Sequence, residues 1–138
     1  MERQSIHTKI NALIAIAVIL FLSLIVIPRL LAAGQKAKEN NLKIFLYNMR
    51  DAIQIYQDDM DDYPAKLDHI AITKAPPKGA LGGQGIVLDE QGFQGPYLKE
   101  IPHDPFMGDV VWDYTPETGE VHSNSKLVAL DGSTYSSW

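Results

Sequence analysis

The sequence contains no cysteine, and its acidic side chains outnumber its basic ones. The absence of cysteine excludes a disulfide scaffold, a thiol nucleophile and a thiolate zinc site. Charge is divided unevenly, because residues 1–41 carry five basic and two acidic side chains, whereas residues 42–138 carry seven and fifteen. An acidic domain repels phosphate backbones, so we expect no nucleic-acid partner for the water-soluble part. At 138 residues, the chain has room for one such domain and an appendage.

Charge is absent from residues 10–27, where Asn11 and Ser23 are the only polar side chains. A helix of this length rises about 27 Å and nearly spans a hydrocarbon core of about 30 Å. We therefore expect a leader-like segment at 1–9, followed by the transmembrane half of a long helix at 10–31. A cleaved signal peptide, with a mature protein that begins near Gly34, is the alternative.

The helical pattern continues beyond the apolar run, because no proline occurs between residues 30 and 58. Apolar side chains recur there at steps of three and four and form a narrow stripe on one side of the helix. The stripe consists of Leu42, Leu46, Met49, Ile53, Tyr56 and Met60. We expect a small antiparallel sheet to cover it, with a coiled coil as the alternative.

Residues 58–62 contain four aspartates and end the predicted helix before Tyr63 and Pro64. We expect these carboxylates on a fraying, solvated end, because the spacing lacks the glycine and final glutamate of an EF-hand calcium loop. Residues 75–96 are rich in glycine and proline, but no lysine followed by serine or threonine completes a nucleotide loop. The segment is therefore expected to be an exposed connection.

A dense turn is predicted around Asp104, which precedes Pro105. Its carboxylate can accept backbone hydrogen bonds, Phe106 can plug the core, and Gly108 can adopt a positive φ. A single histidine on a proline-rich turn is usually solvated, so His103 is interpreted as a surface residue.

Three strands are predicted after this turn, at 110–114, 120–122 and 126–130, the first two joined by a turn at 115–119. The expected class is α+β, with the long N-terminal helix packed against a small antiparallel sheet. The globular domain is assigned to residues 32–138. Its parts are a helix at 32–60, a loop at 61–109, a β-sheet at 110–131 and a polar C-terminal tail at 132–138.

Several segments together resemble a type IV pilin-like protein, most closely the major (G-type) pseudopilin of type II secretion. They are the apolar run that ends in Pro28, residues 33–39, residues 56–64, residues 101–108, the turn at 116–119 and the pair Asp131-Gly132. The resemblance implies a pilin-like fold and a structural subunit of a pilus or pseudopilus that polymerises through its N-terminal helix. It also implies a single pass through the bacterial inner membrane, with the leader-like segment 1–9 in the cytoplasm and the globular domain on the periplasmic or extracellular side. The implied partners are further copies, other pilin-like subunits and the inner-membrane assembly machinery.

Two positions depart from the family pattern. The resemblance implies a glycine before the peptidase cut and a glutamate at the fifth mature position, where this chain has Ile6 and Asn11. Asn11 can form hydrogen bonds but carries no charge to pair with the free amine of a neighbouring subunit. The calcium loop of the family also fits poorly, because no second carboxylate follows Asp131.

The sequence shows no recognisable catalytic triad or metal-ligand spacing, so we expect no enzyme and no catalytic, cofactor-binding or metal-binding residue. A membrane-tethered binding module with a pilin-like domain that does not polymerise is the alternative function. Such a module would capture its partner with the glycine-rich loop or the C-terminal tail.

Overall fold

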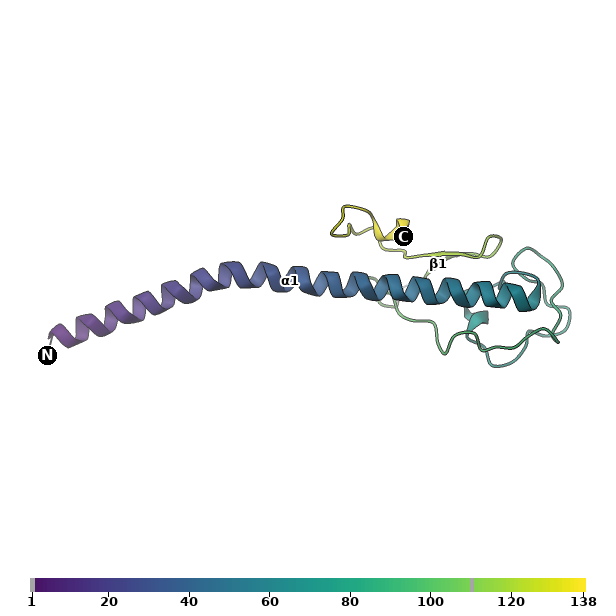
Figure 1. The fold of residues 1–138 in the computed structure, drawn as a ribbon, viewed down its shortest axis with the longest axis horizontal. Coiled ribbons are helices and arrows are strands. Elements are labelled where there is room, and N and C mark those ends of the chain that lie inside the picture. The colour runs from purple at the N-terminus through teal and green to yellow at the C-terminus, as the bar shows by residue number, and fades with distance from the viewer. Residues whose placement is uncertain (1, 110) are drawn as a thin grey trace. The chain divides into compact units, whose positions relative to one another are not determined.

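The structure is a computed structural model that describes residues 2–109 and 111–138 (Figure 1). The chain divides into two compact units, Met1–Ala37 and Lys38–Trp138. Helix α1 runs over Glu2–Met60 and is followed by a short 3-10 helix, η1, at Leu67–Ile70. Strands β1 (Asp113–Thr115) and β2 (Glu120–His122) precede a second 3-10 helix, η2, at Tyr135–Ser137. The α+β class is therefore confirmed.

The core of the second unit is built on the predicted stripe of α1. All six side chains of the stripe are exposed by 2% or less. They form one cluster with apolar side chains from the rest of this unit, namely Leu67, Ile70, Leu88, Trp112, Val121, Ala129 and Tyr135. Full burial of each such large side chain stabilises the fold by about 1.5–3 kcal/mol. The stripe is thus covered within its own domain, which removes the reason for a coiled coil.

The sheet has two antiparallel strands in the described part of the chain, paired with Asp113 opposite His122 and Thr115 opposite Glu120. Between them, the Gly119 amide donates to the Thr115 carbonyl at 2.8 Å. Gly119 has a φ of 69°, and a Cβ there would lie 2.4 Å from the Tyr63 ring, so both backbone and space require glycine. The predicted hairpin is confirmed, but its first strand is shorter than the expected 110–114. Val111 and Trp112 lie outside β1, and Val110 lies outside the described residues.

The prediction of a third strand at 126–130 is wrong. A side-chain hydroxyl takes one of the amides that this strand would use, because Ser125 Oγ accepts from the Leu127 amide. Just before the segment, Ser123 Oγ likewise accepts from the Ser125 amide. The segment instead pairs with the following tail, where the Tyr135 amide donates to the Leu127 carbonyl at 3.1 Å. An isolated bridge between Val128 and Thr134 is what remains of the expected strand.

Two segments expected to be polar surface contribute to the core. In the loop at 75–96, Leu88 is 5% exposed, and a bridge joins Leu81 to Val87. In the tail at 132–138, Tyr135 is 1% exposed and Trp138 packs against the core cluster. Both segments are therefore structural parts of the second unit, Lys38–Trp138, which we call the soluble unit.

Candidate functional site

The apolar run at 10–27 lies within α1, the one helix in the described residues that is long and apolar enough to cross a membrane. Its side chains are exposed; Phe21 and Leu24, for example, are 66% and 75% exposed. The Ser23 hydroxyl donates to the Ile19 carbonyl at 2.8 Å, which satisfies this polar group within the helix. The segment therefore presents an apolar surface suited to lipid or to other helices.

The two positions that depart from the pilin pattern lie at the start of this helix. Ile6 and Asn11 are both exposed on α1. Neither side chain carries a charge, so this end of the helix offers hydrogen bonding at Asn11 but no ion pair at either position.

The end of α1 is fixed by two neighbouring aspartates. Asp61 has a φ of 58° and therefore leaves the right-handed helical conformation. Asp62 is 1% exposed, and its carboxylate accepts hydrogen bonds from the backbone amides of Tyr63 (2.7 Å), Gln84 (3.1 Å) and Ile86 (3.1 Å). The expectation that the whole acidic cluster is solvated is thus wrong at Asp62, which joins the helix end to the glycine-rich loop.

Asp104 forms the predicted turn. Its Oδ1 accepts from the amides of Phe106 at 2.7 Å and Met107 at 3.2 Å, and Gly108 has a φ of 62°. The Ser123 hydroxyl donates to the other carboxylate oxygen, so the turn is tied to the chain after β2. These contacts confirm the turn chemistry read from the sequence.

Two predicted roles beside Asp104 have different outcomes. Phe106 is half-buried rather than a full plug, and its ring stacks on Tyr135 with centroids 4.0 Å apart. The His103 side chain is 78% exposed and lies 3.2 Å from Asp109, which confirms its interpretation as a surface residue.

A second buried carboxylate, that of Glu39, joins α1 to the C-terminal segment, and no sequence pattern predicted it. Glu39 is 7% exposed and accepts from the Leu130 amide and the Tyr135 hydroxyl, each at 2.8 Å. Farther along α1, Arg50 donates to the carbonyls of Val121 at 2.9 Å and Trp138 at 2.6 Å. No short motif could reveal these contacts, because the partners are 71 to 96 residues apart.

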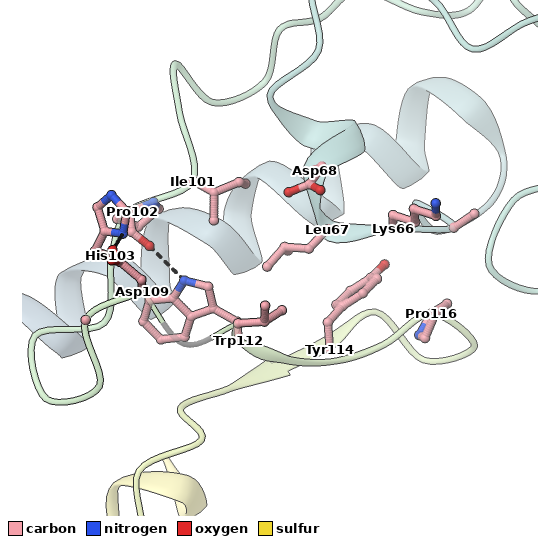
Figure 2. A pocket seen from close by; sticks show the side chains of 13 residues that line it. Lys66, Leu67, Asp68, Ile101, Pro102, His103, Asp109, Trp112, Tyr114 and Pro116 are labelled. Carbon is pink, nitrogen blue, oxygen red and sulfur yellow. Dashed lines mark hydrogen bonds and ion pairs between the residues drawn. The ribbon is translucent and has the colours of Figure 1, made fainter.

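A groove of about 490 Å³ opens between η1 and the hairpin (Figure 2). Leu67, Ile101, Trp112 and Tyr114 give it apolar walls. The polar atoms of the two aromatic residues are engaged within the protein: Trp112 donates to the Pro102 carbonyl at 2.8 Å, and Tyr114 donates to the Pro64 carbonyl at 2.7 Å.

The chemistry available in this groove is limited. Burial raises the pKa of Tyr114 above its ordinary value, so its hydroxyl stays protonated at neutral pH. Within residues 2–109 and 111–138, no group of three histidine, aspartate or glutamate side chains is placed to hold a metal ion. The groove can therefore accept an apolar group, while the expectation of no catalytic, cofactor or metal residue stays a prediction.

An apolar helix that continues into a small helix-and-sheet domain defines a pilin-like membrane protein. The family model described as type II secretion system (T2SS), protein G, matches residues 29–127, which is more than half of the chain. The chain belongs to this family, that of the major pseudopilin. No curated protein and no solved structure gives a significant match.

Membership of this family sets the general role of the chain. It is a structural subunit of the type II secretion pseudopilus, and its family implies assembly with other pseudopilins. The apolar helix and the family together support a single-pass membrane anchor. The G-type pseudopilin resemblance and the pilin-like fold expected from the sequence are both confirmed.

Proposed function

We propose that the chain polymerises through its N-terminal helix into a pseudopilus. The observation that carries the proposal is the long exposed apolar surface at 10–27, in a chain of the protein G family. In a filament, neighbouring helices would cover side chains such as Ile14, Val18 and Phe21. Close packing of these side chains against neighbouring helices favours association through van der Waals contacts.

The membrane arrangement belongs to the same proposal. Residues 1–9 are cytoplasmic, residues 10–31 cross the bacterial inner membrane, and residues 32–138 lie on the periplasmic or extracellular side. The partners are copies of the chain, other pilin-like subunits and the inner-membrane assembly machinery. The single apolar helix and the family membership support this arrangement.

A second candidate function is a tethered binding module that does not polymerise. Ile6 and Asn11 favour it, because they replace the glycine and glutamate that the pilin resemblance associates with processing and registration of subunits. A tethered module would keep the membrane helix and the soluble unit but would remain solitary.

Amine-reactive cross-linking of the tagged full chain, in a cell with type II secretion machinery, separates the two candidates. Polymerisation predicts a ladder beyond the dimer and filaments in sheared material under the electron microscope. A matched control replaces residues 10–27 with an unrelated membrane-spanning helix and should lose both signals. A native chain that inserts into the membrane but gives no ladder would support the tethered module.

A further inference from the structure

The outward side of α1 in the soluble unit carries an apolar patch that the core does not use. Ile44, Tyr47 and Ile55 are 54%, 71% and 43% exposed, and Asp51 lies among them. These four residues follow one another at steps of three and four, so they share one side of the helix. We call these four residues the helix face. They alternate with the buried stripe and point away from it, since a helix turns about 100° per residue.

A second apolar patch lies just before η2. Leu127, Val128 and Leu130 are 56%, 56% and 52% exposed, and Lys126 precedes them on the surface. These four residues form the ridge. Between its apolar members, Ala129 is 6% exposed and its amide donates to the Ser133 carbonyl at 2.7 Å.

The ridge is anchored to the fold, which makes it a defined surface. Its Leu130 amide donates to the buried Glu39 carboxylate at 2.8 Å, and its Leu127 carbonyl accepts from the Tyr135 amide at 3.1 Å. A surface held in one conformation loses little conformational entropy on binding, which favours its use in an interface.

We propose that the ridge of one copy docks on the helix face of the next copy. The inference rests on the proposed polymerisation and names a contact between soluble units within it. The two patches lie on different elements of one unit, so the contact is head to tail and leaves both patches available at the ends of an assembly. Repetition of such a contact yields an open filament rather than a closed dimer.

Charge favours this pairing over a symmetric contact between two helix faces. Asp51 lies near the middle of the helix face, so such a symmetric contact would bring the two Asp51 carboxylates close together. Like charges brought together at an interface oppose association. Docking of the ridge on the helix face instead brings Lys126 toward Asp51, and both patches contribute apolar side chains to the contact.

The absence of cysteine makes a direct test possible, because introduced thiols are unique. Two full-length chains with different tags, one Tyr47→Cys and one Leu127→Cys, are produced together in cells with the secretion machinery and treated with a short bismaleimide linker. We expect the mixed product to exceed either same-site product at least several-fold. The matched control is Val111→Cys, whose parent side chain is 77% exposed but lies outside both patches. Mixed cross-linking no stronger than with this control would overturn the proposal.

A charge exchange provides the second arm of the test. Asp51→Lys should reduce the mixed product several-fold, and the addition of Lys126→Asp to every copy should restore it. Glu90→Lys makes the same change in net charge at an exposed loop position and should have no such effect. Equal effects of Asp51→Lys and Glu90→Lys would contradict the pairing.

Amine-reactive cross-linking of the same samples distinguishes the two levels of inference. A ladder without the mixed 47–127 product would overturn this interface and leave polymerisation standing. Loss of both signals from membrane-inserted chains would overturn both. Thermal melting of each variant shows whether its fold is intact, and the cross-linking of intact variants decides the outcome.

Discussion

The Tyr135 hydroxyl donates a 2.8 Å hydrogen bond to the Glu39 carboxylate, which joins η2 to the beginning of the soluble unit. The same carboxylate accepts from the Leu130 amide. Both donors would lose this acceptor in Glu39→Ala, which should cost about 1–3 kcal/mol for each donor left buried and unsatisfied. Thermal melting of the full chain in detergent, followed by near-ultraviolet circular dichroism, measures the loss.

Glu39→Gln is the matched control for this prediction, because its amide retains a carbonyl oxygen as acceptor. It should melt closer to the native chain than Glu39→Ala does. Tyr135→Phe removes one of the two bonds and should cost about 0.5–1.5 kcal/mol. Equal melting temperatures for the native chain and these three variants would show that the hydrogen bonds to Glu39 do not stabilise the fold.

The carboxylate at the end of α1 gives a second prediction. Asp62→Ala removes the acceptor for the amides of Tyr63, Gln84 and Ile86 and should destabilise the chain by about 1–3 kcal/mol for each amide that remains buried. Asp58→Ala is the control, since Asp58 is exposed and should change stability by less than about 0.5 kcal/mol. Similar melting of the two variants would mean that Asp62 is no more important than a surface aspartate.

A pair of tyrosines provides a third prediction with opposite outcomes. The Tyr56 hydroxyl is buried and has no hydrogen-bond partner among the residues that the structure describes, whereas Tyr114 donates to the Pro64 carbonyl. Tyr56→Phe should therefore be neutral or stabilising, because it removes a buried polar group without breaking a bond. Tyr114→Phe should cost about 0.5–1.5 kcal/mol. Denaturant unfolding of both variants measures the difference, and a larger loss for Tyr56→Phe would contradict the assignment.

The Tyr56 variant also tests a pH dependence. Burial raises the pKa of Tyr56 to about 12, so the folded chain holds this proton more tightly than the unfolded chain does. The associated stability is complete below about pH 10 and is lost as the pH rises from there toward about 12. Melting temperatures measured across this range should fall less steeply for Tyr56→Phe than for the native chain. Parallel curves would show that Tyr56 does not titrate in this way.

Phe106 gives a fourth prediction, corrected for its partial burial. Loss of a fully buried phenylalanine costs about 3–5 kcal/mol, but Phe106 is half-buried, so Phe106→Ala should cost about 1–3 kcal/mol. The variant loses the stack on Tyr135. Phe106→Leu keeps an apolar side chain without the ring and should fall between the two proteins in thermal melting. An unchanged melt of Phe106→Ala would show that the ring contributes nothing to the soluble unit.

Local patterns predicted the parts of the fold whose partners are near in sequence. The stripe from Leu42 to Met60 follows from helical periodicity, and the turn at Asp104 follows from the reach of an aspartate to amides two and three residues ahead. The hairpin likewise follows from a proline and a glycine in a short turn. Each of these features depends on chemistry within a few residues of chain.

The remaining features depend on partners far apart in sequence. The buried Asp62 carboxylate accepts hydrogen bonds from the amides of Gln84 and Ile86, more than twenty residues farther along the chain. The buried Tyr135 hydroxyl donates to Glu39, which lies 96 residues away in the sequence. Neither distance leaves a periodic signal in the sequence. The expected third strand does not form for a local reason. The hydroxyls of Ser123 and Ser125 accept hydrogen bonds from nearby backbone amides, and the alternation of apolar and polar side chains gives no sign of these bonds.

The last prediction concerns Ile6 and Asn11 and the assembly of the filament. Contacts between apolar helices are nonspecific along the helix axis, so a polar device is needed to set the register of neighbouring subunits. The pilin resemblance implies that a glutamate supplies it and that a glycine permits processing. Asn11→Glu combined with Ile6→Gly should therefore allow cleavage before His7 and raise the yield of filaments. A charge costs about 2.5–3.5 kcal/mol near the centre of a membrane helix, but position 11 lies near the end of the apolar run, where snorkelling reduces this cost.

Three chains separate the two effects in a cell with intact secretion machinery: the native chain, Asn11→Glu alone and the double variant. Mass spectrometry of the purified subunits shows whether cleavage has occurred before His7, and electron microscopy of sheared material measures filament yield. We expect cleavage and filament yield to be highest in the double variant, because Asn11→Glu alone retains Ile6 at the cut. If the native chain is cleaved and assembles as well as the double variant, then Asn11 is no impairment. Register must in that case come from another contact, for which the pairing of Asp51 with Lys126 is the candidate that the soluble unit offers.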